Sequence, residues 1–266
     1  MKQINRWFLF SLFIVWIGAG CASQSYPWDG DWVLVWEDHF HDSALNLNDW
    51  QPSEQGLNYN NEDQAYTNAN VTIEDSAGNG ILVLTAKSGH WEGPSGRADN
   101  PTENVTREYT SGEANTKQSW TYGKFEARAR VPKTQGVLSA VWMTPADAGW
   151  PPEIDIMEIL GHDPATVYFT NHYGTSQNHQ MKSSHYTGSD FSNDYHIYTL
   201  EWEPGILRWY VDGVKYFESR SGVPGEPFIL RLSLPVGPDW EEDPDDTSEF
   251  PQRFEIDWVR VYQRGK

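Results

Sequence analysis

The chain contains 266 residues, 38% of them hydrophobic, which is enough to bury the core of one large domain. Its 38 acidic residues outnumber its 19 basic residues, and the resulting net charge of −19 repels nucleic acid and anionic lipid surfaces. Aromatic residues reach 14% and include 14 Trp, whose flat faces suit stacking on sugar rings as well as packing in a core. Composition therefore argues against a disordered chain and against a nucleic-acid-binding protein.

The first 20 residues form the pattern of a signal peptide. Lys2 and Arg6 provide a short positive region, and residues 7–18 are almost wholly apolar but shorter than the roughly 20 residues of a membrane-spanning helix. Small residues precede Cys21, the only Cys in the chain, as in a bacterial lipoprotein processing site. We expect export, with Cys21 either lipidated in the outer membrane or lost by ordinary cleavage and secretion. A single Cys also excludes an intrachain disulfide.

Residues 21–31 predict a tether, and residues 32–266 predict one domain because no linker or repeat interrupts them. Apolar and polar residues alternate with a period of two along residues 124–131, which is typical of a half-buried strand. Residues 206–211 and 214–217 predict a hairpin across Asp212-Gly213. Further strands are predicted at residues 33–36, 81–86, 137–143, 167–172, 195–202, 228–234 and 254–262. This pattern predicts an all-β jelly-roll sandwich of the concanavalin A-like kind, with two antiparallel sheets and a concave substrate cleft.

The segment Glu153-Ile154-Asp155-Ile156-Met157-Glu158 carries the candidate chemistry. On a strand, Glu153 and Asp155 share one face while Ile154 and Ile156 point into the core. Strict alternation would bury Glu158, and an isolated ionised carboxylate in an apolar core is very costly. A β-bulge near Met157 would return Glu158 to the acidic face. The sequence therefore predicts three carboxylates in a row on one face.

These carboxylates suggest glycoside hydrolysis. With the bulge, Glu153 and Glu158 lie about four strand steps apart, roughly 13 Å between Cα atoms. Inward-leaning side chains would approach the ~5–5.5 Å of retaining enzymes, and the wider separation of inverting enzymes stays open. Repulsion from Asp155 would keep one carboxyl protonated near neutral pH. A solvated acidic face or a calcium ligand set are the alternatives for the same residues.

Residues 150–161, Trp-Pro-Pro-Glu-Ile-Asp-Ile-Met-Glu-Ile-Leu-Gly, resemble the active-site signature of glycoside hydrolase family 16, and the extra Met resembles its laminarinase-like branch. The similarity extends along nearly the whole chain beyond the tether. Further matches in family order lie at residues 35–40, 60–67, 109–112, 122–128, 140–143, 250–252 and 257–263.

The resemblance implies roles for individual residues. It makes Glu153 the nucleophile, Glu158 the general acid/base and Asp155 the assisting carboxylate. The positions implied to line the sugar subsites are Asn60, Trp142, Trp150 and His172. On composition alone, Trp120 and Trp240 are expected to be further aromatic residues of the cleft.

Relatives of this kind often hold a structural calcium ion, and Asp257 with Glu37 or Asp38 fits that pattern, with solvated surface carboxylates as the alternative. The chain departs from the laminarinase-like pattern at three places near the cleft. Glu113 stands where Arg is common, Ser233 and Pro235 where Asn and Ala are usual, and residues 239–246 form an acidic loop.

We therefore expect a monomeric, retaining endo-β-1,3-glucanase that acts on laminarin-like β-glucans and requires no cofactor. The alternatives within the class are a mixed-linkage (1,3-1,4)-β-glucanase and a β-agarase-like galactan hydrolase. The alternatives of another class are a carbohydrate-binding module, since sandwich lectins share this architecture, and a structural surface lipoprotein. Membrane contact is expected only through the lipid at Cys21.

Overall fold

The computed structural model describes residues 30–56, 60–76, 79–96, 103–146, 149–237 and 239–265. The predicted signal peptide, Cys21 and residues 21–29 of the predicted tether lie outside the described residues. Within these ranges, none of the helices has the length and apolar character of a membrane span.

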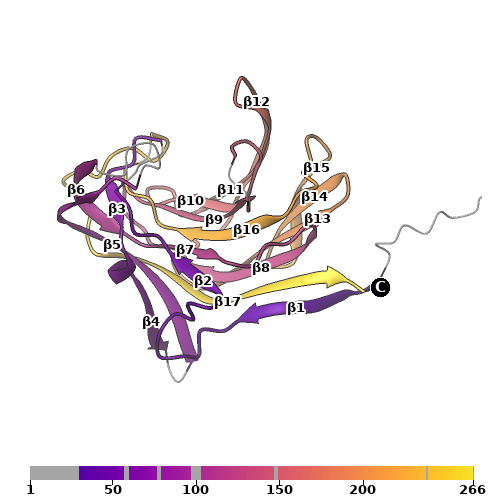
Figure 1. Cartoon of the computed structure of the whole chain (residues 1–266), viewed down its shortest axis with the longest axis horizontal. Coiled ribbons are helices and arrows are strands. Elements are labelled where there is room, and N and C mark those ends of the chain that lie inside the picture. Colours follow the sequence, from indigo (N-terminus) through magenta and orange to yellow (C-terminus); the bar gives the residue numbers. More distant parts are fainter. Residues whose placement is uncertain are drawn as a thin grey trace, which may run out of the picture.

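Two curved sheets pack against each other, as the sequence predicted (Figure 1). The ten-stranded sheet contains β1 (Trp32–Asp38), β3 (Gln64–Tyr66), β4 (Val71–Ser76), β5 (Asn79–Pro94), β6 (Asn104–Ser111), β8 (Gly123–Arg130), β13 (His196–Glu203), β14 (Ile206–Val211), β15 (Val214–Ser219) and β17 (Gln252–Arg264). The seven-stranded sheet contains β2 (Trp50–Pro52), β7 (Glu113–Thr116), β9 (Leu138–Pro145), β10 (Glu153–Leu160), β11 (Thr166–Thr175), β12 (Asn178–Thr187) and β16 (Phe228–Ser233). A 3₁₀ turn, η1 (Asn68–Asn70), precedes β4.

The seven-stranded sheet positions the candidate site. Its strand order is β12-β11-β10-β9-β16-β7-β2, so β10 lies near the middle, between β9 and β11. Every described pair in this sheet is antiparallel. The ten-stranded sheet differs from the predicted antiparallel sheet at one place, because β3 and β6 pair in parallel.

Alternating burial along the strands builds the core between the sheets. Along β8, Phe125, Ala127 and Ala129 are buried while the residues between them are partly exposed, as the period of two predicted. The predicted hairpin forms between β14 and β15. Asp212 and Gly213 both have positive φ (49° and 78°), the conformation that a tight two-residue hairpin turn requires.

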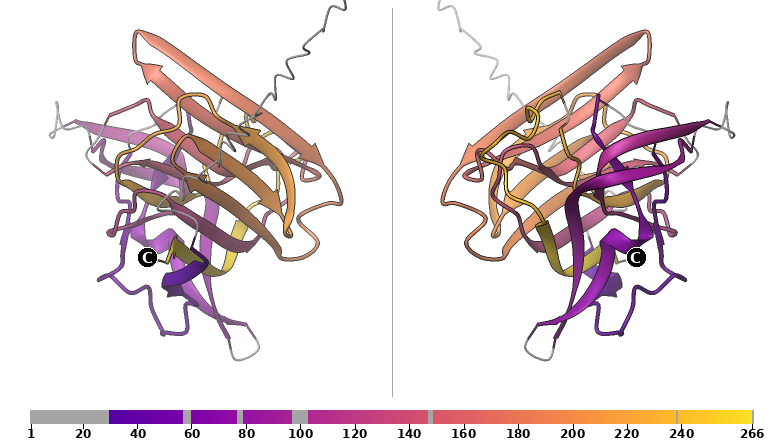
Figure 2. Two further views of the ribbon diagram at one scale, coloured as in Figure 1. Left: turned by 90° about the vertical axis from the view of Figure 1, so that its right-hand side faces the viewer. Right: turned by 90° about the vertical axis from the view of Figure 1, so that its left-hand side faces the viewer.

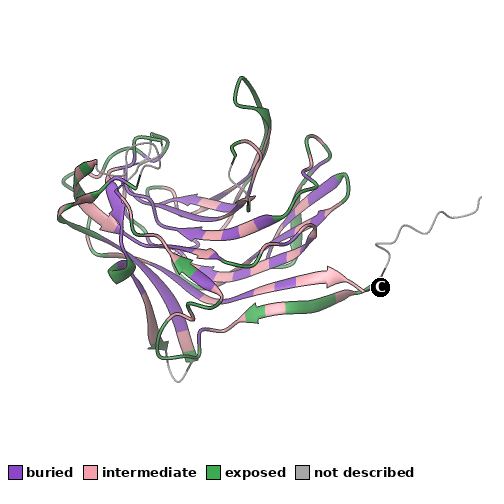
Figure 3. Cartoon of the chain, in the orientation of Figure 1, coloured by how far each residue is buried: buried purple, intermediate pink, exposed green. Residues whose placement is uncertain are grey.

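The hairpin of β11 and β12 extends beyond the body of the sheets (Figures 1 and 2). Most of β12 is exposed, and Figure 3 shows the hairpin tip in the colour of exposed residues. The sequence Asn-His-Gln-Met-Lys-Ser-Ser-His-Tyr-Thr has no clear apolar alternation, so β12 was not predicted. It forms because β11 supplies a continuous register of backbone partners from Thr166 to Thr175.

Candidate active site

A β-bulge in β10 brings the three predicted carboxylates onto one face. Asp155 lies opposite Trp142 on β9, but the next pair joins Met157 to Val141, so β10 carries one extra residue. On the other side, β11 pairs Glu153 with His172 and Glu158 with Tyr168, four residues apart. The bulge predicted near Met157 is confirmed, and so is the four-step separation of the two Glu residues.

Burial separates the two kinds of side chain in β10. Ile154, Ile156 and Met157 belong to the hydrophobic core, whereas Glu153 and Glu158 remain partly exposed. The irregular backbone at the bulge also receives support from the opposite sheet, because the indole Nε1 of Trp209 on β14 donates to the carbonyl oxygen of Asp155 at 2.8 Å. This bond fixes the strand at the point where its alternation changes.

His172 connects two of the carboxylates. Its Nε2 lies 3.2 Å from Asp155 Oδ2 and 3.6 Å from Glu153 Oε1. Its side chain is 18% exposed and that of Asp155 only 4%, so these charges interact with little screening by water. One ligand-type atom from each of the three residues lies within 4.8 Å of the others. Such spacing also suits a metal ion, but the third carboxylate, Glu158, on the same face favours an acid-base centre.

Burial and mutual repulsion hold protons on the carboxylates. Desolvation and then Asp155 raise the pKa of Glu153 to about 8. Desolvation, Asp155 and Glu153 raise the pKa of Glu158 well above its ordinary value, and burial raises the pKa of Asp155. His172 opposes the rise at Glu153, whereas every influence on Glu158 raises its pKa. His172 and Arg231 therefore favour the ionised form of Glu153, whereas no influence favours the ionised form of Glu158.

Trp142 lies beside the carboxylate triplet, which consists of Glu153, Asp155 and Glu158. It pairs with Asp155 of β10 on one side and with Arg231 of β16 on the other. Its indole Nε1 donates to Ser233 Oγ at 3.0 Å, so one of the departures from the family pattern holds this ring in place. The Arg231 guanidinium lies 4.9 Å from the centre of the Trp142 ring and donates to Thr144 Oγ1 at 2.9 Å. Trp142 is therefore a partly exposed ring with a cation beside it.

Glu113 contacts the same guanidinium from β7. It is 5% exposed, and its Oε1 lies 3.4 Å from Arg231 Nη1 and accepts from Ser53 Oγ at 2.6 Å. Where the family pattern has Arg on β7, this chain has a buried Glu paired with an Arg on the neighbouring strand β16. Sequence reasoning did not connect Arg231 with the site. The alternation Leu-Arg-Leu-Ser-Leu of residues 230–234 would have placed Arg231 and Ser233 on the non-core face.

Trp150 covers the other end of the triplet. Its ring is 49% exposed and lies 5.9 Å from His172 and 4.7 Å from His179, measured between ring centres. His179 on β12 was not predicted as part of the site. Its Nε2 lies 2.8 Å from His172 Nδ1.

Comparison with known proteins identifies the scaffold. The family model "Glycosyl hydrolases family 16" matches residues 57–260. The chain belongs to glycosyl hydrolase family 16. It is 34% identical to "Beta-glucanase" of Rhodothermus marinus, over 99% of this chain and 97% of that protein, and 35% identical to "Glucan endo-1,3-beta-glucosidase" of Cryptopygus antarcticus, over 88% and 93%. The catalytic domain of an endo-1,3-beta-glucanase (laminarinase) from Thermotoga petrophila RKU-1 superimposes with a TM-score of 0.77 at 34% identity, covering 89% of this chain and all of that one.

The other predicted subsite residues of this family 16 enzyme occupy different places. Trp240 is 44% exposed and packs edge-on against Tyr168, 4.7 Å between ring centres. Since Tyr168 pairs with Glu158 across the strands, Trp240 stands at the Glu158 end of the triplet. Asn60 is exposed, and its carbonyl oxygen accepts from the backbone N–H of Asp239, next to Trp240. Substrate contact by Asn60 and Trp240 stays a prediction.

The prediction that Trp120 lines the cleft is wrong. Trp120 is only 4% exposed and belongs to the hydrophobic core, where it contacts Trp36 and Phe125 at 5.6 and 6.0 Å between ring centres. Composition cannot distinguish a core Trp from a cleft Trp, because both bury most of the ring.

The side chains proposed for calcium are paired with other side chains in this structure. Asp257 pairs with Arg128 at 2.5 Å, and Glu37 with Arg260 at 3.2 Å and with His39 at 2.9 Å. A cation would have to compete with these guanidinium groups, and among the described residues no cluster of three His, Cys, Asp or Glu side chains includes Asp257 or Glu37. A calcium ion at this place stays a prediction. Asp38 is also engaged, by the Trp50 indole at 2.9 Å.

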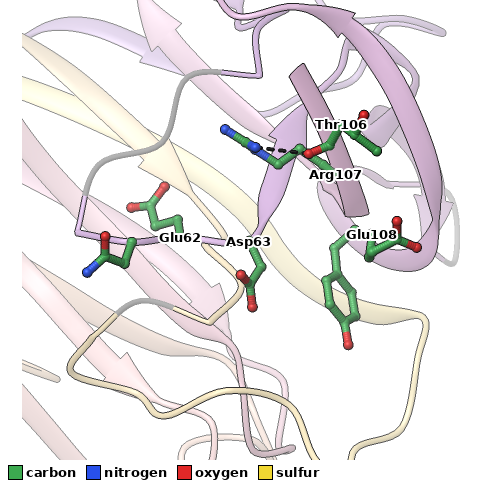
Figure 4. A pocket seen from close by; sticks show the side chains of 7 residues that line it. Glu62, Asp63, Thr106, Arg107 and Glu108 are labelled. Carbon is green, nitrogen blue, oxygen red and sulfur yellow. Dashed lines mark hydrogen bonds between the residues drawn. The ribbon is translucent and has the colours of Figure 1, made fainter. Parts of the chain in front are cut away.

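A separate pocket of about 640 Å³ lies between residues 61–63 and β6 (Figure 4). Glu62, Asp63 and Glu108 give it an acidic lining, and Arg107 donates to the carbonyl oxygens of Thr106 and Gly56 at 2.9 and 2.7 Å. The carboxylates of β10 do not line this pocket.

Proposed function

We propose that this family 16 enzyme is a retaining endo-β-1,3-glucanase that cleaves internal bonds of laminarin-like β-glucans. The observation that carries the proposal is the bulge in β10, which places Glu153, Asp155 and Glu158 on one open face beside His172. The fold and length similarity to β-1,3-glucan-cleaving relatives supports the choice of substrate. Binding alone would gain nothing from three mutually repelling carboxylates, which favours an enzyme over a sugar-binding module.

The proposed reaction has two displacement steps. Glu153, whose ionised form His172 favours, attacks the anomeric carbon as a carboxylate while Glu158 gives its proton to the leaving glycosidic oxygen. Glu158, now a carboxylate, then removes a proton from the water that hydrolyses the glycosyl–Glu153 ester, and both residues return to their initial states. Asp155 and His172 stabilise the changing charge on Glu153, because His172 lies near both carboxylates.

Around this centre, Trp142, Trp150 and Trp240 would stack on sugar rings and Asn60 would donate or accept hydrogen bonds, since all four are at least partly exposed. The chemistry of this mechanism requires no metal or redox cofactor.

Product analysis on laminarin, lichenan, agarose and carrageenan tests the proposal. We expect short oligosaccharides from laminarin, with the β-anomer formed first in the proton NMR spectrum. Release of products from lichenan alone would assign a mixed-linkage glucanase, and release from galactans alone would refute the glucanase. Initial formation of the α-anomer would refute retention.

We also propose that the protein is exported and carries a lipid anchor at Cys21, or is secreted after ordinary cleavage. The apolar segment of residues 7–18 and the small residues before Cys21 support this proposal. A monomer is the expected oligomeric state.

A further inference from the structure

Two histidines on the projecting hairpin form a direct link to the catalytic carboxylates. His172 Nδ1 and His179 Nε2 lie 2.8 Å apart, and the ring planes differ by only 19° with centres 5.0 Å apart. Across the strands His172 pairs with Met181, whereas His179 pairs with Gly174. The histidines are therefore diagonal neighbours on one face of the hairpin, a distance that a long or planar side chain can span.

The backbone at Gly174 makes this approach possible. Gly174 lies directly opposite His179 and has a φ of +97°, and a Cβ at this position would meet the Asn178 carbonyl oxygen at 2.3 Å. With no side chain opposite it, the His179 ring can lean along the hairpin toward His172. Trp150 packs against the same ring at 4.7 Å and confines it further.

The contacts of His172 then determine which of its ring nitrogens donates and which accepts in each protonation state. Its Nε2 faces two carboxyl groups, and whenever one of them is ionised it accepts a hydrogen bond, so Nε2 then carries a hydrogen. When His172 is neutral, Nδ1 is an acceptor and needs a donor; when it is an imidazolium, Nδ1–H is a donor and needs an acceptor. His179 Nε2 can supply either role by changing its tautomer, which a fixed donor or acceptor cannot do.

We propose that His179 is a positioning residue that keeps the Nε2–H of His172 directed at Asp155 and Glu153 in both protonation states of His172. This inference rests on the proposed function, in which that hydrogen stabilises the carboxylates during the reaction. His179 also connects His172 with water, since its side chain is exposed.

The charged neighbours of His172 agree with this role. Burial lowers the pKa of His172, but Asp155 and Glu153 outweigh burial, so the net shift is upward. Asp155 and Glu153 approach from β10, His179 from β12, and the Trp150 ring covers the remaining side. An acceptor at Nδ1 adds to the stabilisation of the imidazolium that the two carboxylates begin.

The test uses two substitutions at His179 and one neighbouring control. His179→Phe keeps a planar ring against Trp150 but removes both nitrogens, whereas His179→Gln keeps a group that can donate and accept. Gln180→Ala is the control, because Gln180 is exposed on the same strand but alternates to the opposite face. The readouts are the His172 ring ¹⁵N chemical shifts as a function of pH and the pH dependence of kcat and KM on laminarin.

For His179→Phe we expect the pKa of His172 to fall by about one unit, kcat to fall about tenfold at pH 8 with a smaller loss at pH 6, and KM to stay within about twofold. His179→Gln should recover most of both effects, and Gln180→Ala should change neither. Unchanged His172 shifts and kcat in a folded His179→Phe variant would overturn the proposal, as would an equal loss in His179→Gln. The NMR titration needs no substrate, so it still decides the histidine link if laminarin proves not to be the substrate.

Discussion

Within β10, three carboxylates and three apolar side chains share a segment of six residues. The β-bulge in this segment places the carboxylates on one face and the apolar side chains on the other. Without the bulge, Glu158 would enter the core on the same face as Ile154 and Ile156, which are 0% and 1% exposed. With it, Glu158 lies opposite Tyr168, four residues along β11 from the partner of Glu153. A local irregularity of the backbone thus determines which side chains share the acidic face.

Replacing the proposed nucleophile tests this assignment directly. Glu153→Gln keeps the volume of the side chain but cannot form the glycosyl ester, so we expect kcat on laminarin to fall by at least about 10³-fold. The circular dichroism spectrum should remain that of the wild type, because the amide can still hydrogen-bond. Full activity in this variant would show that another residue is the nucleophile.

Glu158, the proposed general acid, should lower the stability of the fold in a pH-dependent way. Because the pKa of Glu158 is higher in the folded than in the unfolded chain, its carboxyl reduces the free energy of unfolding at pH values above the unfolded-state pKa, near 4.3. We therefore expect Glu158→Gln to raise Tm by roughly 2–4 °C at pH 8 and to leave it unchanged near pH 4. Calorimetry across this pH range measures the difference, and an equal gain at both pH values would contradict the linkage.

Among the larger elements, the acidic loop of residues 239–246 carries Trp240 and is anchored by a buried carboxylate. Glu241 is fully buried, and its Oε1 accepts from the backbone N–H groups of Gly136 and His162 at 2.9 and 3.3 Å. His162 Nδ1 lies 3.1 Å from the same oxygen. The loop is therefore fixed through Glu241 to Gly136, which precedes β9, and to His162, which follows β10.

Removing this anchor should affect stability and substrate binding together. Glu241→Ala leaves two backbone donors without their partner, which costs about 1–3 kcal/mol in the free energy of unfolding. We expect a lower Tm and a KM for laminarin about 3–10-fold higher, the latter because Trp240 loses its fixed position. Trp240→Ala should raise KM with little change in Tm, and Glu242→Gln, an exposed neighbour, should change neither. Equal KM values in wild type and Glu241→Ala would exclude the anchoring role.

For the whole molecule, the proposed export and anchoring would depend on residues outside the part of the chain that the structure describes. Cys21 is the single Cys, so it is available to a lipid and forms no intrachain disulfide. We expect the wild type expressed in a Gram-negative bacterium to fractionate with the outer membrane, and Cys21→Ser to appear in soluble fractions with unchanged kcat. Soluble wild-type enzyme would favour ordinary cleavage and secretion.

Much of the fold and the centre of the site could be predicted from the sequence. Local alternation predicts β8, the turn residues predict the β14–β15 hairpin, and the cost of a buried charge predicts the bulge in β10. These features depend on residues adjacent in the chain, where the period of a strand and the preference of a turn act directly.

The surroundings of the site depend on strands that meet only in the folded sheet. Glu113 and Arg231 are 118 residues apart and form one ion pair because β7 and β16 are neighbours. Trp120 packs in the core, although the high Trp content of the chain had suggested a place in the cleft. His179 reaches His172 only because polar β12 pairs with β11 and Gly174 leaves room. The sequence alone determined which side chains share the acidic face of β10, since covalent neighbours set their alternation; tertiary pairing decided which partners contact them, since those contacts join distant segments.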